Sequence, residues 1–133
     1  MNNLSAEYDR IMMAICIWRE ARGEPEIAKR GVAHVLLNRV TDPRKRWPST
    51  PAAVVLQLRQ FSSFNSGDPN ATKFPLPDDH AWLVCCEIVA DPGSDPADGA
   101  NHYHSYADPL MYPKWADPHH MTAILGALKF YKL

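Results

Sequence analysis

The sequence predicts an α+β fold, mostly α, in which residues 1–133 form a single domain with a buried central helix and a small β region. The chain has 133 residues, a length that favours one domain. Residues 11–18 form an unbroken apolar run, which as a helix would be apolar on every side and therefore buried. Residues 101–106 alternate in character, as expected of a strand.

The first helix is expected to begin with Ser5 as its N-cap and to end near Ala21. Its side chains divide into two faces by their three- and four-residue spacing. One face holds Ile11, Ala14, Ile15 and Trp18, and the other holds Met13, Cys16 and Ile17. Glu20 continues the second face, so a carboxyl group lies at the end of a buried helix. Gly23 and Pro25 then favour the end of that helix.

A second and a third helix follow in the sequence. The second is expected over residues 26–40, with one buried stripe and with Gly31 at a point of close helix contact. The stripe consists of Ala28, Val32, Val35, Leu36 and Arg39. The third is expected from Pro51 to about Leu58, because Thr50 can cap it and proline is favoured in a first turn.

The second half of the chain is expected to be richer in loops. Residues 65–79 form a long segment rich in Pro, Gly and Asp, and loops of that length are often functional. Asp79 can then cap a helix over residues 80–90. Its expected core face consists of Trp82, Leu83, Cys86 and Val89. Residues 108–120 are expected to be irregular, and residues 121–133 to form either a closing strand or a helix.

The composition argues against several classes of function. The formal net charge is −1, so no strong field favours nucleic acid or an anionic membrane as a partner. No apolar run approaches the roughly 20 residues that cross a bilayer, so we expect no membrane insertion. The N-terminal residues lack the basic start and the small-residue cleavage site of a secretion signal. We therefore expect the protein to be made in a cytoplasm and to stay there until something releases it.

The cysteine and histidine patterns do not favour a metal centre. The three cysteines are odd in number and two of them are adjacent, so we expect buried free thiols at Cys16, Cys85 and Cys86. A zinc amidase or peptidase could use the histidines at 102 and 104 or at 119 and 120, and this is the alternative. No H-E-x-x-H motif is present, so no metal and no cofactor are expected.

Glu20 has the clearest chemical use among the acidic residues. Partial burial disfavours the charged form of a carboxyl group. A glutamate that keeps its proton near neutral pH can donate it to a leaving oxygen, as cleavage of a glycosidic bond requires. The alternative is a structural glutamate at a helix end, paired with Arg19, Arg22 or Lys29.

Two further segments have a composition typical of a sugar site. Residues 59–65 mix aromatic rings, which stack on the apolar faces of sugars, with amides and hydroxyls that hold sugar hydroxyls. The alternative there is an ordinary turn with two buried rings. Tyr112, Lys114 and Trp115 are further cleft candidates. His34 is expected to be a packed, hydrogen-bonded histidine.

Several motifs occur in an order that is typical of one enzyme family. They are W-R-E-A-R-G-E-P from residue 18, G-V-A-H-V-L-L-N-R-V from residue 31, W-P-S-T from residue 47 and Q-F-S from residue 60. The motifs D-G-A-N-H-Y-H-S, P-K-W-A and I-L-G-A-L-K-F-Y then continue the order to the C-terminus. From about residue 10 onward, the chain resembles the SleB-type cell wall hydrolases, which include spore cortex-lytic enzymes and phage lysins.

This resemblance implies a lysozyme-like fold and cleavage of peptidoglycan glycan strands. The catalytic glutamate of the family falls on Glu20. The expected substrate-binding residues are Glu24, Gln60, Phe61, Ser62, Tyr103, His104 and Trp115. The family's aromatic segment, often Tyr-Tyr-Asn, reads His-Tyr-His-Ser here, and its usual Ile-Gly-Asn-His near the end reads Leu-Gly-Ala-Leu.

Two mechanisms are open for such an enzyme. A hydrolytic muramidase or glucosaminidase generally needs a second carboxylate. A lytic transglycosylase can use one glutamate as acid and then as base, so that the bond between MurNAc and GlcNAc is cut and 1,6-anhydro-MurNAc forms. Glu24 is expected to orient the turn or Glu20, and the loop aspartates are expected to be caps and turn residues. The transglycosylase is therefore favoured, and a non-enzymatic wall-binding module is a third alternative.

The expected biological setting follows from the size of the chain. A small catalytic domain without a signal or a wall-binding module resembles a phage endolysin of a Gram-negative host. We expect a monomer that waits in the cytoplasm of the host cell. It would reach the peptidoglycan of the wall and periplasm once a holin opens the inner membrane.

Overall fold

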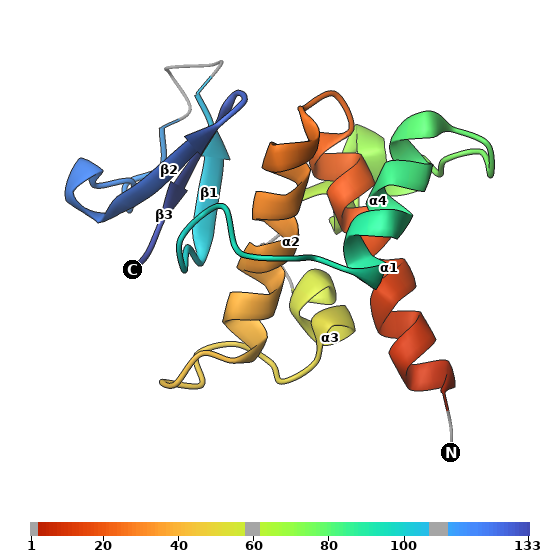
Figure 1. Ribbon diagram of the computed structural model, residues 1–133, viewed down its shortest axis with the longest axis horizontal. Helices are drawn as coiled ribbons and strands as arrows, with labels where there is room; N and C mark the ends of the chain where they lie inside the picture. Colours follow the sequence, from red (N-terminus) through yellow and green to blue (C-terminus); the bar gives the residue numbers. More distant parts are fainter. Residues whose placement is uncertain (1–2, 58–61, 107–111) are drawn as a thin grey trace.

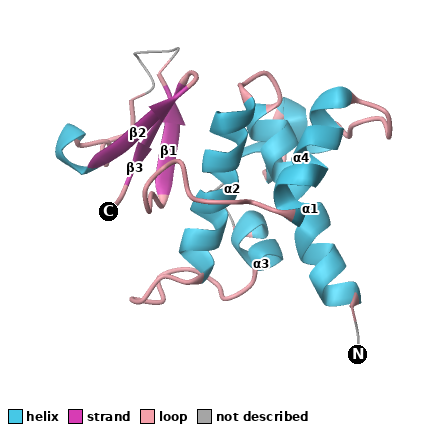
Figure 2. Cartoon of the chain, viewed as in Figure 1, coloured by secondary structure: helices cyan, strands magenta, loops and turns pink. Residues whose placement is uncertain are grey.

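A computed structural model describes residues 3–57, 62–106 and 112–133, which form a helical layer and a small sheet beside it (Figure 1). The helices are α1 (Leu4–Ala21), α2 (Glu26–Val40), α3 (Pro51–Leu56) and α4 (His80–Ala90). The strands are β1 (His102–Ser105), β2 (Met121–Leu125) and β3 (Leu128–Tyr131). The strands are antiparallel in the order β1-β3-β2, and α2 lies between the sheet and α1 (Figure 2).

The central position predicted for the first helix is confirmed, because α1 packs against α2, α3 and α4. Its two faces enter two core clusters, one containing Ala14 and Trp18 and the other containing Met13 and Cys16. Ile17 was predicted on the face of Met13 and Cys16, but it lies in the cluster of Ala14 and Trp18. Ile11 departs from the expectation and is 52% exposed. It lies on an early turn of α1 and lines a shallow groove between α1 and α4, so the helix is fully covered only toward its C-terminal end.

Two of the three predicted N-caps are confirmed and one is wrong. Ser5 is not the N-cap of α1, because the helix begins at Leu4 and Asn3 occupies the cap position. The Thr50 side chain accepts a hydrogen bond from the backbone N–H of Ala53, as predicted. The predicted Asp79 cap is also confirmed, since its carboxylate accepts hydrogen bonds from two backbone N–H groups in the first turn of α4.

Two expectations about the shorter helices were wrong in detail. The third helix ends at Leu56 because Gln57 already has an extended backbone. In α4 the most buried residues are Cys85 and Ile88, whereas Leu83, expected in the core, is 46% exposed. Nearly every residue of α4 is apolar, so spacing alone does not select its buried face.

The end of the chain forms a β-hairpin, so the strand alternative is confirmed and the helix alternative is wrong. Strands β2 and β3 pair through a tight turn in which Gly126 has a φ of 56°. Glycine adopts this left-handed conformation without steric cost. The hairpin then pairs with β1 through β3, which places the alternating segment predicted as a strand at one edge of the sheet.

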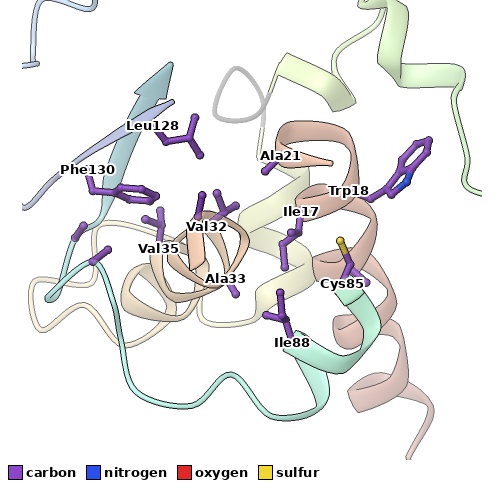
Figure 3. Packing of buried hydrophobic residues seen from close by; sticks show 14 residues of the cluster. Ile17, Trp18, Ala21, Val32, Ala33, Val35, Cys85, Ile88, Leu128 and Phe130 are labelled. Carbon is purple, nitrogen blue, oxygen red and sulfur yellow. The ribbon is translucent and has the colours of Figure 1, made fainter. Parts of the chain in front are cut away.

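Phe130 fixes the sheet to α2. It is fully buried, and Figure 3 shows it and Leu128 pointing from β3 toward Val32 and Val35 of α2. A Cβ atom added at Gly31 would lie 2.7 Å from Cζ of Phe130. The close contact predicted at Gly31 therefore exists, but its partner is a strand and not another helix.

The cysteine and histidine predictions can be compared directly with the structure. Cys16, Cys85 and Cys86 are free thiols, and the first two are buried as predicted, whereas Cys86 is half-buried. Burial raises the pKa of Cys16 well above its ordinary value and that of Cys85 to about 12, so both stay protonated. His34 is packed and its Nε2 lies 3.1 Å from the carbonyl oxygen of Pro92, as predicted. None of the helices in the part of the chain that the structure describes is long and apolar enough to span a bilayer.

Candidate active site

The structure brings the predicted acid and the predicted aromatic segment together. Glu20 is half-buried in the last turn of α1. The hydroxyl of Tyr103, on β1, donates a hydrogen bond of 2.9 Å to its Oε1. Within the described ranges, no other hydrogen bond reaches the Glu20 carboxyl group. This contact joins the end of the central helix to the edge strand of the sheet.

Tyr103 can only be the donor in this contact near neutral pH. Burial raises the pKa of its hydroxyl well above the ordinary value, and the neighbouring Glu20 carboxylate raises it further. The hydroxyl therefore stays protonated and is directed at Oε1. When Glu20 carries a proton, that proton belongs on Oε2, because Oε1 already accepts the hydrogen bond from Tyr103.

The side chains of Arg19, Arg22 and Lys29 bond to groups other than the Glu20 carboxyl. The ion pair that was the structural alternative for Glu20 is therefore not observed. Lys29 is buried, and its Nζ donates hydrogen bonds to the carbonyl oxygens of Arg22 and Glu24. These carbonyls follow the last turn of α1, where a cation is favourable. The side chain of Arg19 likewise donates to backbone carbonyls and not to Glu20.

Arg19 and Arg22 fasten residues 62–74 to the end of α1. Nε of Arg19 donates to the carbonyl oxygen of Lys73 at 3.0 Å, and its Nη1 donates to that of Ser63 at 3.3 Å. Nη2 of Arg22 donates to Oδ1 of Asn70 at 3.1 Å. This segment is therefore fixed beside the turn that carries Glu20. The sequence analysis missed this role, although both arginines lie in the same motif as Glu20.

Glu24 fastens the chain after α1 to the β-hairpin. Its Oε1 accepts a hydrogen bond of 2.7 Å from the backbone N–H of Ala127, next to the turn at Gly126. This agrees with the expectation that Glu24 orients the turn. Binding of substrate by Glu24 stays a prediction.

The predicted cleft segment is only partly described. Gln60 and Phe61 lie outside the described residues, and so does the side chain of Ser62, whose backbone begins the short 3₁₀ helix η1 (Ser62–Phe64). Ser63, which the sequence analysis did not single out, is buried and its Oγ has no hydrogen-bond partner in the described part of the chain. The neighbouring Phe64 packs against the same core cluster as Tyr103, and η1 contacts α1, the helix that carries Glu20.

His104 and Trp115 are not brought to Glu20. Side chains alternate along a strand, so His104 faces away from the side on which Tyr103 contacts Phe130. His104 is buried and stacked on Tyr131, and its Nε2 lies 2.9 Å from the Tyr131 hydroxyl. Trp115 contacts the same ring cluster edge-on. Substrate binding by these two residues would therefore use a surface of the sheet other than the one that meets Glu20.

His102 belongs to the same ring cluster as His104, Tyr131 and Trp115, and its pKa is shifted. It lies between Trp47 and Trp115, with ring centroids 5.7 and 4.8 Å away. Burial lowers the pKa of His102 to about 4, and the positive charges of Arg39 and Arg46 add to this effect. The ring is therefore neutral in the folded protein at neutral pH.

This predicts a loss of stability in mild acid. The unfolded chain takes up a proton near the ordinary histidine pKa of 6.5, whereas folded His102 stays neutral down to about pH 4. In that window the unfolded state binds more protons, so the free energy of unfolding falls as the pH falls. Urea unfolding at several pH values should show this slope reduced in His102→Gln. The same slope in both proteins would contradict the assignment, and His80→Gln, at an exposed histidine, is the matched control.

Three of the four histidines predicted as alternative metal ligands, His102, His104 and His119, are engaged by protein groups. Nδ1 of His102 lies 2.8 Å from Oδ1 of Asn101, and Nδ1 of His119 lies 2.9 Å from the Asp117 carboxylate. Among the residues that the structure describes, no group of three or more His, Cys, Asp or Glu side chains is placed to hold a metal ion.

Comparison with known proteins identifies the family. A sequence profile of cell wall hydrolases matches residues 23–131. The chain belongs to the cell wall hydrolase family. The matched region of this cell wall hydrolase begins after Glu20, so the role of that residue depends on its motif and on the geometry above.

Curated relatives of the cell wall hydrolase are spore cortex-lytic enzymes. The protein from Halalkalibacterium halodurans is 32% identical over 104 residues, which make up 76% of this chain and 29% of that protein. The protein from Bacillus cereus is 31% identical over 98 residues, 74% of this chain and 35% of that protein. The chain thus spans about a third of the length of these relatives.

Solved structures share the whole fold. The catalytic domain of the germination-specific lytic transglycosylase SleB from Bacillus anthracis is 28% identical with a TM-score of 0.75, covering 99% of this chain and 100% of that one. The catalytic domain of Bacillus cereus SleB is 26% identical with a TM-score of 0.70, covering 95% and 91%. The lysozyme-like, mostly helical fold with a small β region that the sequence predicts is therefore confirmed.

Proposed function

We propose that residues 1–133 form one catalytic domain that cleaves peptidoglycan glycan strands as a lytic transglycosylase. The observation that supports this best is the single glutamate at the end of the central helix, held through one oxygen by Tyr103. The likeness to the catalytic domain of a lytic transglycosylase over 99% of the chain supports the reaction type. The substrate class follows from the cell wall hydrolase family.

Glu20 acts first as general acid and then as general base in the proposed reaction. Its carboxylic acid gives the proton on Oε2 to the glycosidic oxygen between MurNAc and GlcNAc, and the bond to C1 of MurNAc breaks. The resulting carboxylate removes the proton from the 6-hydroxyl of the same MurNAc, whose oxygen then bonds to C1. The product is 1,6-anhydro-MurNAc, the acid is regenerated, and no water is consumed.

The surroundings of four other carboxylates support a mechanism with one glutamate. Glu24 is bound to the backbone N–H of Ala127 in the hairpin turn. Asp68 caps the short 3₁₀ helix η2 (Pro69–Thr72), and Asp79 caps α4. Asp95 accepts hydrogen bonds from backbone N–H groups in its own turn. Each of these carboxylates has a structural partner, whereas Glu20 is the one expected to act on substrate.

Mass spectrometry of digested peptidoglycan tests the reaction. We expect fragments that end in 1,6-anhydro-MurNAc and that appear at the same rate in excess chelator. Reducing-end products that carry an added molecule of water would reject the transglycosylase in favour of the hydrolytic muramidase or glucosaminidase. Loss of all cleavage in chelator would favour zinc catalysis, and binding without cleavage would indicate a wall-binding module.

Tyr103→Phe is expected to lower kcat about tenfold while KM changes little. The variant keeps the partly buried ring but loses the hydroxyl that orients Glu20. A hydrogen bond contributes up to about 1.5 kcal/mol, which is about tenfold in rate. Steady-state kinetics on solubilised glycan strands give kcat and KM separately for the variant and the parent. A rise in KM alone, or kinetics equal to those of the parent, would show that Tyr103 does not position the acid.

The biological setting is a separate proposal. We propose that the domain acts as an endolysin, monomeric in the cytoplasm of the host cell and dependent on a holin for access to the wall. The spore cortex-lytic relatives suggest germination as the competing setting. Cytoplasmic expression in a Gram-negative cell should cause lysis only when a holin is co-expressed. Lysis without a holin, or none with one, would contradict the proposal.

A further inference from the structure

The guanidinium of Arg19, the residue before Glu20, contacts two aromatic rings. Its guanidinium carbon is 4.6 Å from the ring centroid of Phe64 and 4.7 Å from that of Phe74. Phe64 is the inner ring, because it packs against the core cluster that contains Cys16. Phe74 is the outer ring and is 65% exposed. The three side chains therefore form a stack from the core to the surface.

The outer ring of this stack is held in place by its backbone. Arg19 is only 7% exposed, and it donates hydrogen bonds to the carbonyl oxygens of Ser63 and Lys73. Lys73 directly precedes Phe74 in the chain. The loop thus fixes the position of the Phe74 ring, while most of that side chain remains in contact with water.

An exposed aromatic ring that is already fixed suits a ligand with an apolar face. Water contact with such a ring is unfavourable, and a fixed ring loses little conformational freedom when a ligand covers it. The C–H face of a pyranose ring has the right shape and chemistry for this contact, whereas its hydroxyls remain in water. The ring is attached through Arg19 to the helical turn that carries Glu20, the next residue in the chain.

We infer that Phe74 is a sugar-stacking platform that binds a pyranose ring of the glycan strand at a distance from the bond that is cleaved. This inference depends on the proposed function and specifies one of its subsites. Phe74 is then a substrate-binding residue, and Arg19 is the positioning residue behind it. Leu76, two positions further along the loop, is 71% exposed but has no aromatic ring to stack on a sugar, so it provides a matched control.

The inference can be tested by binding of glycan oligosaccharides of alternating GlcNAc and MurNAc to variants in a Glu20→Gln background, measured by calorimetry. Phe74→Ala should weaken binding of long oligosaccharides by about three- to tenfold, the range expected for one aromatic stacking contact. Phe74→Trp should bind at least as tightly as the background protein, and Leu76→Ala should bind equally well. The penalty of Phe74→Ala should disappear with a disaccharide that is too short to reach the ring.

Two outcomes would overturn the inference. One is an unchanged affinity for long oligosaccharides in Phe74→Ala, and the other is an equal loss in Leu76→Ala. Thermal unfolding of each variant shows whether the fold is intact, and an exposed side chain predicts no large change in melting temperature. Failure of the proposed function would be distinct, because the unmodified protein would then release no glycan fragments that end in 1,6-anhydro-MurNAc.

Discussion

Glu20→Gln is expected to lower the rate of peptidoglycan cleavage about a thousandfold while leaving the fold intact, because general acid catalysis commonly contributes this much. The amide has nearly the shape of the acid, and its oxygen can still accept the hydrogen bond from Tyr103. It cannot supply a proton to the glycosidic oxygen or remove one from the 6-hydroxyl. Loss of turbidity of a peptidoglycan suspension gives the rate, and thermal unfolding shows that the fold is retained.

Glu24→Gln is the matched control for this experiment, since it changes the other glutamate of the same motif. Its amide oxygen can still accept the hydrogen bond from Ala127, so stability should stay close to that of the parent. Loss of the predicted contact between Glu24 and substrate should raise KM, while kcat stays close to the parental value. If Glu24→Gln lost as much activity as Glu20→Gln, two carboxylates would be needed and the hydrolytic mechanism would be favoured. If Glu20→Gln cleaved at the parental rate, Glu20 would not be the acid.

The helices could be predicted because their signals are local. The end of α1 near Ala21 and the bounds of α2 follow from the apolar run, Gly23 and Pro25. Thr50 and Asp79 are capping residues whose side chains bond within one turn. Such signals need no knowledge of the rest of the fold. They fail where composition is uniform, as in the apolar helix α4.

The site could be predicted only in part, because its contacts join distant segments. Glu20 was placed by its position on a buried helix, but its hydrogen bond with Tyr103 was not predicted, because the family resemblance only assigned both residues to one site. The anchoring role of Arg19 has no local signal, since it bonds residues 44 and 54 positions away. One signal was present and not used: strand alternation places Tyr103 and His104 on opposite faces of the sheet, so the two were unlikely partners in one cleft.

Phe130→Ala is expected to reduce the free energy of unfolding by about 3–5 kcal/mol, the usual cost of removing a buried phenylalanine side chain. The ring is fully buried, meets Gly31 on α2 and lies 5.8 Å from the Tyr103 ring, centroid to centroid. Neither neighbour can fill the space, because Gly31 has no side chain and Tyr103 is held by Glu20. The same change should lower activity, since Tyr103 would lose the packing that directs its hydroxyl. Urea unfolding and turbidity assays measure the two effects.

The controls decide whether Phe130 acts by fixing the sheet to α2. Ile124→Ala, on β2, removes an apolar side chain that is 51% exposed and should cost far less stability. Gly31→Ala alone should be destabilising, because its added methyl group would overlap the Phe130 ring. Combining Gly31→Ala with Phe130→Leu should cost less than the sum of the two single changes, since the smaller side chain leaves room for the methyl group. Strict additivity would mean that the two residues do not share one contact, and the sheet would then have to be held against the helices by other side chains.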